Sequence, residues 1–285
     1  MKSITGVHDA PPLHWVGDGF NVRSLFSYQE PLDLSPFILL DHAAPKAFSP
    51  TEKQRGVGWH PHRGFETVTI VYEGEVEHRD SLGNGGVIGP GDVQWMTAAK
   101  GILHEEYHSR AFAERGGTMQ MVQLWVNLPA KDKMSAPGYQ TILAGDIPVV
   151  ALPHGTGDVR VIAGGFGGAN GAATTHTPMD VLDLRLRGGS GVDIPASKGR
   201  TLGIVVLDGT FRVNDVADAG AGQLVTFDRS DAGARLDATA DAAALILSGV
   251  PLDEPVTGYG PFVMNTRDEI RQAIDDFNAG RMGAL

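Results

Sequence analysis

Turn-forming residues recur so regularly along this chain that they leave little room for long helices. Glycine and proline clusters, such as residues 81–86 and 89–92, recur about every ten residues between short runs rich in β-branched and aromatic residues. The sequence has 38 glycines and 17 prolines in 285 residues, which is many for a helical protein. Short strands at this spacing are typical of a sandwich or a barrel, so the sequence predicts an all-β fold.

One helix is nevertheless expected, at the C-terminal end of the chain. Within residues 265–280, Thr266 and Glu269 match a capping box, and Gly280 matches a C-terminal stop. The segment carries one apolar stripe at helical spacing, formed by Ile270, Ala273, Ile274 and Phe277. A stripe of this kind more often faces a core than a partner protein, so we expect it to face the core.

The two halves of the chain repeat one pattern. An apolar strand, an acidic residue followed by glycine, and a second strand occur at 68–80 and again at 203–215. A glycine-containing turn followed by a strand then occurs at 89–96 and again at 220–227. The shared order and spacing indicate two copies of one β-barrel unit, although two β-rich stretches can also share turns and valines by chance.

A break in the β pattern separates the two copies. Residues 128–139 lose the alternation of strands and turns, and we expect a linker there that runs to about residue 145. The predicted domains are 1–140 and 141–285, the second of which includes the C-terminal helix. A chain of 285 residues is long enough for two such domains, and each half can bury a core.

Two pairs of potential metal ligands lie in the first copy. His60 and His62 flank Pro61, and His104 and Glu106 have the same spacing about 40 residues later. Residues i and i+2 of a strand point to one face, so two adjacent strands would bring three imidazoles and one carboxylate together. This donor set suits iron, manganese, nickel, copper or zinc, and it leaves open positions for a substrate or O₂. A single His-x-His motif is more often without a metal; the combination of the two pairs favours ligation.

The second copy lacks this ligand set. When the copies are aligned on their turn glycines, the residues opposite the two pairs are Pro195, Ser197, Arg235 and Asp237. Eight of the ten histidines also precede residue 110. If a metal is bound, we therefore expect it once, in the N-terminal half.

Composition excludes several classes of function. The formal net charge of −11 argues against a broad phosphate-binding face, so we expect no direct binding of nucleic acid. The absence of cysteine excludes disulfides, thiolate nucleophiles and cysteine-ligated zinc. No run approaches the roughly 20 apolar residues of a membrane span, and the N-terminus lacks the apolar core of a signal peptide. We expect a soluble, cytoplasmic protein with no membrane association.

The metal-ligand region resembles the pirin family of the cupin superfamily. The resemblance rests on HPHRGFET at 60–67 and PGDVQWMTAAKGILHEE at 90–106. QLWVNLP at 123–129 and PFVMNTRDEIRQA at 261–273 also resemble pirin segments. Compared with the general cupin motif, the second block has two extra residues and Thr97 near the expected proline, departures that pirins share.

The resemblance implies a bicupin, in which two jelly-roll-like β-barrels pack together and the N-terminal one holds the metal. Carried over to this sequence, the ligands are His60, His62, His104 and Glu106. The implied cofactor is one divalent transition metal, with Fe(II) expected first and Mn, Ni, Co, Cu or Zn as alternatives.

Other polar residues near the motifs are assigned lesser roles. Glu66 shares the face of the histidine pair in this interpretation and could support a ligand from behind. Glu105 points away on a regular strand, His108 lies beyond the ligand pair and is left out, and His78 on the next strand is expected to be exposed. Arg63 and the following Gly64 are expected in a loop, with no catalytic role.

Some pirins resemble quercetin 2,3-dioxygenases in activity, which implies an oxidoreductase acting on a flavonol and O₂. Glu106 would accept the proton of the 3-hydroxyl group, and the central ring would open with release of carbon monoxide. The apolar residues expected around the substrate are Phe65, Val68, Met96 and Trp125.

Two other functions stay open from the sequence. The alternative to an enzyme is a metal- or redox-dependent regulatory protein that acts through contact with a protein partner, which an acidic chain suits better than contact with DNA. A cupin without activity is the third. The intact ligand set argues against it, because a purely structural barrel does not need four polar groups converging in its core.

Overall fold

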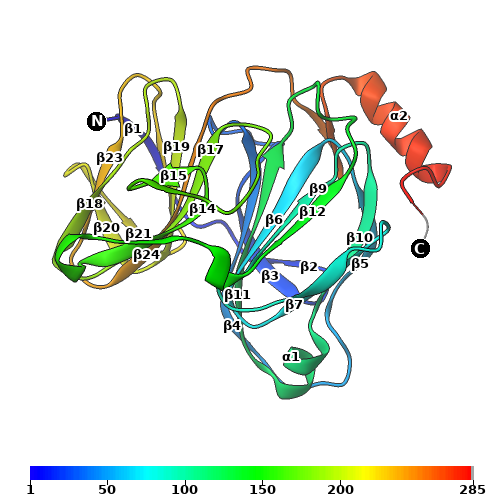
Figure 1. Cartoon of the computed structure of the whole chain (residues 1–285), viewed down its shortest axis with the longest axis horizontal. Helices are drawn as coiled ribbons and strands as arrows, with labels where there is room; N and C mark the ends of the chain where they lie inside the picture. Colours follow the sequence, from blue (N-terminus) through cyan, green and yellow to red (C-terminus); the bar gives the residue numbers. More distant parts are fainter. Residues whose placement is uncertain (284–285) are drawn as a thin grey trace. The chain divides into compact units, whose positions relative to one another are not determined.

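The computed structural model describes residues 1–283 and confirms the mostly β architecture (Figure 1). Its strands form two compact units, which we call the first barrel and the second barrel. The first barrel comprises Pro12–Pro31, Ile38–Ala144 and the segment from Asp253 onward; the second comprises Met1–Pro11, Leu32–Phe37 and Gly145–Leu252.

Two sheets build the first barrel. The larger sheet has the strand order β12 (Gly138–Ile142), β9 (Val93–Thr97), β6 (Phe65–Glu73), β11 (Gly117–Asn127), β4 (Phe37–Phe48), β3 (Phe20–Ser27) and β2 (His14–Val16). The smaller sheet has the order β5 (Gly56–His62), β10 (Ile102–His108), β7 (Val76–Asp80) and β8 (Gly85–Ile88). The short helix α1 (Arg110–Arg115), the hairpin of β25 (Thr257–Tyr259) and β26 (Phe262–Met264), and the C-terminal helix α2 (Arg267–Asn278) complete the unit.

The second barrel is built in the same way. Its larger sheet has the order β1 (Ile4–His8), β22 (Leu224–Phe227), β19 (Thr201–Asp208), β24 (Ala242–Gly249), β17 (Met179–Leu186), β14 (Gly157–Ala163) and β13 (Val149–Ala151). Its smaller sheet has the order β18 (Ser190–Ile194), β23 (Ala234–Ala238), β20 (Thr210–Val213) and β21 (Ala217–Gly220). A small hairpin joins β15 (Gly165–Phe166) to β16 (Ala169–Asn170), and two 3-10 turns lie at Ala144–Asp146 and Pro153–Gly155. One continuous apolar cluster fills the space between the sheets.

The strand orders confirm the internal repeat. When β6 is matched with β19, strands β4 to β11 correspond in chain order to strands β17 to β24, and both the larger and the smaller sheets then show the same neighbours. Each larger sheet also gains an edge strand from elsewhere in the chain, β12 beside β9 and β1 beside β22. Strand β12 lies inside the segment that the sequence assigned to a linker, so that part of the linker prediction is wrong.

The compact units differ from the predicted domains 1–140 and 141–285 at both ends of the chain. Residues 1–11 belong to the second barrel, because β1 pairs with β22. The C-terminal helix belongs to the first barrel. Sequence order alone does not reveal either exchange, because both depend on pairing between distant segments.

The structure corrects the alignment of the two copies by one residue. In the first barrel Glu106 pairs with His78, and in the second Leu236 pairs with Val213. The turn glycines place His78 on Val213, so the counterpart of Glu106 is Leu236 and not Asp237. A shift of one residue moves a side chain to the other face of a sheet, so the correction replaces polar counterparts with apolar ones. With this register the four counterparts are Ile194, Ala196, Ala234 and Leu236, all of them in the apolar core of the second barrel.

The C-terminal helix α2 (Arg267–Asn278) begins as predicted, with a complete capping box between Thr266 and Glu269. Its buried face consists of Ile270 and Ala273, which pack with Leu103 of β10. The predicted stripe does not extend to Phe277, whose side chain is 40% exposed. No helix within residues 1–283 combines the length and the apolar character needed to cross a membrane.

An ion pair anchors α2 to the loop that follows β5. Arg63 Nη1 lies 2.7 Å from Asp276 Oδ2, and both side chains are largely buried. Burial by itself would raise the pKa of Asp276, but hydrogen bonds from Arg63, Arg281 and Gln272 outweigh it and lower that pKa to about 2. Asp276 is therefore a carboxylate at neutral pH and compensates the buried guanidinium.

We predict that Asp276→Ala lowers the free energy of unfolding by on the order of 3 kcal/mol at neutral pH, because it leaves Arg63 buried without its partner. Asp275→Ala, at an exposed position of the same helix, is the matched control and should change little. Because the pKa of Asp276 is lowered in the folded state, its contribution is present above pH about 4 and declines as the pH falls toward 2. Urea unfolding of the three proteins checks this, and equal stability of the two variants would contradict it.

Candidate metal centre

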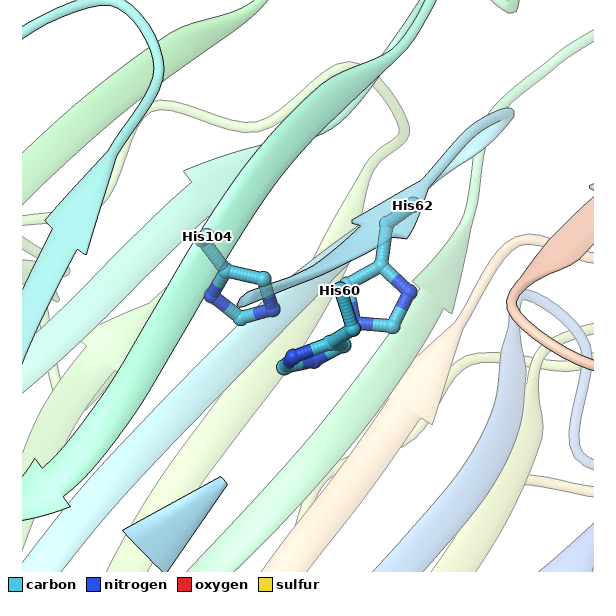
Figure 2. A group of neighbouring side chains, drawn as sticks. All are labelled: His60, His62 and His104. Atoms are coloured by element: carbon cyan, nitrogen blue, oxygen red, sulfur yellow. The ribbon is translucent and has the colours of Figure 1, made fainter. Parts of the chain in front are cut away.

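Three histidines converge from two paired strands of the first barrel (Figure 2). His60 and His62 lie on β5, and His104 on β10 stands opposite His60 in the antiparallel register. The ring centroids are 4.2 Å apart for His60 and His104, and 4.8 Å apart for each of the other two pairs. One ring nitrogen from each histidine falls within 4.8 Å of the other two.

Each of the three rings already uses its Nδ1 atom. His60 Nδ1 lies 2.8 Å from the carbonyl oxygen of Gly58, and His62 Nδ1 lies 3.3 Å from that of Pro261. A carbonyl group can only accept, so Nδ1 of both rings carries the hydrogen and Nε2 keeps its lone pair when the ring is neutral. Nδ1 of His104 also has a neighbour, at 3.4 Å, while its Nε2 is buried with no hydrogen-bond partner within residues 1–283.

Burial keeps these imidazoles neutral. It lowers the pKa of His60, and it lowers the pKa of His62 and His104 well below the ordinary value of histidine. Neighbouring histidines lower the last two further, because like charges repel. Neutral imidazoles with free Nε2 lone pairs are good ligands for a divalent transition metal, so this donor set fits such an ion.

Glu106 lies near His104 but not in the same group as His60 and His62. It forms an overlapping group with His104 and His78, whose ligand atoms also fall within 4.8 Å of one another. A β-bulge lies next to the histidine pair: His104 stands opposite His60, whereas Glu106 stands opposite Val57, so β5 contains one extra residue between Val57 and His60. The sequence did not predict this bulge, whose extra residue lies outside both ligand pairs.

Three side chains of the larger sheet hold the Glu106 carboxylate. Thr69 Oγ1 and Gln94 Nε2 donate to Oε1 at 3.1 and 3.4 Å, and Gln123 Nε2 donates to Oε2 at 3.2 Å. The donors form one row across the inner face of the sheet, since Thr69 pairs with Gln94 on β9 and with Gln123 on β11. Sequence reasoning missed them, although a polar residue inside each apolar strand is a signal that could have identified them.

Burial raises the pKa of Glu106 to about 7, and the hydrogen bonds from Thr69 and Gln94 oppose this rise only in part. In the metal-free protein the group is therefore balanced between its two protonation states near neutral pH. Such a group can exchange a proton with a ligand at little cost.

We predict that Glu106→Gln changes the pH dependence of the stability of the metal-free protein. The folded-state pKa of Glu106 lies above its ordinary value of 4.5, so its contribution to stability is fully present below pH 4.5 and is lost as the pH rises through about 7. The glutamine variant does not titrate there and should gain up to about 3 kcal/mol over the wild type between pH 4.5 and 8.

Denaturant unfolding of both proteins in the presence of a chelator, at several pH values, measures this difference. Parallel stability curves for the two proteins would contradict the prediction.

A cavity of about 180 Å³ opens beside the histidines. Its polar lining consists of Asp41, His60, His62, Glu106 and Gln123, and its apolar lining of Val16, Phe20, Val22, Val57, Met121 and Trp125. Of the predicted apolar neighbours, Trp125 lines the cavity, and Phe65 stacks on Trp125 at 4.3 Å. Val68 and Met96 are buried but do not line it.

The remaining polar residues differ in part from their predicted positions. His78 is fully buried rather than exposed, so that prediction is wrong. His108 lies apart from the group and bonds the carbonyl oxygen of Gly19. Glu66 lies on β6 and accepts a hydrogen bond from Thr97. Arg63 lies between β5 and β6 as expected, but it anchors the C-terminal helix.

Comparisons with known proteins match the whole chain. The family model described as Pirin covers residues 19–126, and the model of the Pirin C-terminal cupin domain covers residues 181–283. A Pseudomonas aeruginosa protein named "Putative quercetin 2,3-dioxygenase" is 57% identical over 282 residues, which span 99% of this chain and 98% of that protein. A pirin-like protein of Caulobacter vibrioides is 40% identical over 93% of this chain and 94% of that protein. A crystal structure of quercetin 2,3-dioxygenase from Acinetobacter baumannii has 52% identity and a TM-score of 0.97, with 100% of this chain and 99% of that chain covered.

Proposed function

The chain belongs to the pirin family and has its two cupin domains, and on that premise we propose that it is a metal-dependent dioxygenase that acts on a flavonol such as quercetin. The observation that carries the proposal is the group of two buried histidines and the half-buried His60, whose Nδ1 atoms all have neighbours and whose Nε2 atoms stay available. The names of the relatives support the same class of reaction, with a small-molecule substrate and O₂.

Four residues would hold the ion in this proposal: His60, His62, His104 and Glu106. Their nitrogen and oxygen donors suit Fe(II), which we expect first, as well as Mn, Ni, Co, Cu or Zn. When bound, the metal supplies Lewis acidity and an open position for the substrate and O₂.

Glu106 is the proposed base. It lines the cavity, where its carboxylate would accept the proton of the 3-hydroxyl group of a flavonol. The hydrogen bond from Gln123 fixes the direction of the carboxylate. Deprotonation prepares the substrate for oxygenation, opening of its central ring and release of carbon monoxide.

The apolar wall suits the aromatic rings of the substrate. Trp125 presents its ring to the cavity and packs edge-on against His62 at 5.1 Å. The volume of about 180 Å³ is below the roughly 300 Å³ at which ligand pockets usually begin, so we expect the cavity to enclose only the reacting ring system. The rest of a flavonol would extend from its opening.

We predict that protein loaded with Fe(II) consumes quercetin and O₂ in proportion to its metal content, and that His104→Ala lowers both metal affinity and turnover by more than about 100-fold. Loss of a ligand should exceed the roughly 10–100-fold effect of losing a residue that only supports a ligand. The measurement combines quercetin absorbance, oxygen uptake and metal analysis.

His176→Ala is the matched control, because it removes an exposed histidine of the second barrel. Unchanged turnover in His104→Ala would contradict the proposed site. Stoichiometric metal without any loss of quercetin would contradict the dioxygenase and favour the metal-dependent regulatory protein, for which a partner would then be sought.

A further inference from the structure

Another buried histidine, His78, lies next to His104. His78 is on β7, next to β10, and its Nδ1 lies 3.4 Å from His104 Nδ1. The ring is fully buried and stacks on Tyr139 of β12, with centroids 5.0 Å apart. His78 is not among the four proposed metal ligands.

The direction of the contact between the two rings follows from simple hydrogen-bond chemistry. His104 can offer the Nε2 lone pair to a metal in its neutral form only when Nδ1 carries the hydrogen. That hydrogen then points to His78 Nδ1, which must accept and therefore carries its own hydrogen on Nε2. The opposite arrangement would place a hydrogen on His104 Nε2 and prevent ligation.

On its other side, the His78 ring faces the carboxylate of Asp80. Its Nε2 lies 3.7 Å from Asp80 Oδ2, which is beyond hydrogen-bond range, so the carboxylate faces this nitrogen without bonding it directly. Asp80 is held in place by the turn that follows β7, because the backbone N–H groups of Leu82 and Asn84 donate to Oδ1, each at 2.9 Å. The side-chain amide of Asn84 donates to Oδ2, also at 2.9 Å. A series of contacts thus leads from the turn through Asp80 and His78 to His104.

In all three candidate histidine ligands Nδ1 faces a hydrogen-bond acceptor, but the acceptor differs. His60 and His62 donate Nδ1–H to backbone carbonyl groups, whereas His104 has an imidazole in that role. Ligating histidines usually donate the other ring N–H to a carbonyl, a carboxylate or water, and that partner fixes the tautomer and the orientation of the ring.

We propose that His78, whose Nε2 faces the Asp80 carboxylate, is a positioning residue that fixes the tautomer and orientation of His104 for metal binding. The inference rests on the proposed function, because it assumes that His104 is a ligand. The rival interpretation makes His78 a ligand itself, in the group with His104 and Glu106. In that arrangement the metal would take His104 Nδ1, and the hydrogen on the buried Nε2 would have no acceptor within residues 1–283.

Two substitutions of His78 separate positioning from packing. His78→Phe keeps a ring that can stack on Tyr139 but removes the acceptor, and His78→Gln keeps a side-chain acceptor. His42→Phe is the matched control, because His42 is also buried in the first barrel but lies outside both histidine groups.

The affinity for Zn(II), measured by competition with a chelating dye, should fall about 10–100-fold in His78→Phe and recover at least in part in His78→Gln. The control should bind like the wild type. In the metal-free proteins, two-bond ¹⁵N–¹H correlations should show His104 with hydrogen on Nδ1 in the wild type and a mixture of tautomers in His78→Phe. This tautomer change is a readout that loss of packing alone would not produce.

Wild-type affinity and an unchanged His104 tautomer in His78→Phe would overturn the proposal. So would an equal loss of affinity in His78→Phe, His78→Gln and His104→Ala, which would identify His78 as a ligand. A wild type that binds no Zn(II) would overturn the metal centre and this inference together, whereas binding without quercetin turnover would overturn only the dioxygenase.

Discussion

The engagement of each Nδ1 atom is the constraint on which the candidate centre depends. The partners come from three places: Gly58 on β5 itself, Pro261 in the C-terminal segment and His78 on β7. A neutral imidazole has one donor and one acceptor nitrogen, so a partner that accepts from Nδ1 leaves Nε2 as the acceptor. The surrounding hydrogen bonds thereby favour both the direction of each ring and the form in which it can bind a metal.

Burial also favours the neutral form of the three imidazoles, and the second barrel shows that the fold can form without such a polar cluster. Desolvation lowers the pKa of the three histidines and raises that of Glu106. The second barrel repeats the same strand order with an apolar core at the corresponding positions. The fold itself therefore does not need a buried polar cluster, and such a cluster is unfavourable unless its groups are satisfied. This contrast supports a functional role for the cluster in the first barrel.

The C-terminal segment contributes to the same centre from far along the chain. His62 and Pro261 are 199 residues apart in sequence, yet a hydrogen bond joins them. The ion pair between Arg63 and Asp276 anchors helix α2 beside this contact, and the side-chain nitrogen of Lys133 donates to the carbonyl groups of Gly64 and Val263. The segment after the second barrel is thus part of the support of the histidine cluster, which explains why it belongs to the first compact unit.

The sequence by itself determined the features that depend on local pattern: the strands and turns, the internal repeat, the capped helix and the two ligand pairs. These follow from side-chain periodicity and turn chemistry, which neighbouring residues specify. Only the tertiary structure decided which strands are neighbours and in which register. That decision placed a bulge in β5 before His60, buried His78 beside His104, and moved the second-barrel counterparts from Arg235 and Asp237 to Ala234 and Leu236. Pairing and burial join residues far apart in the chain, and one residue of register changes the face on which a side chain lies.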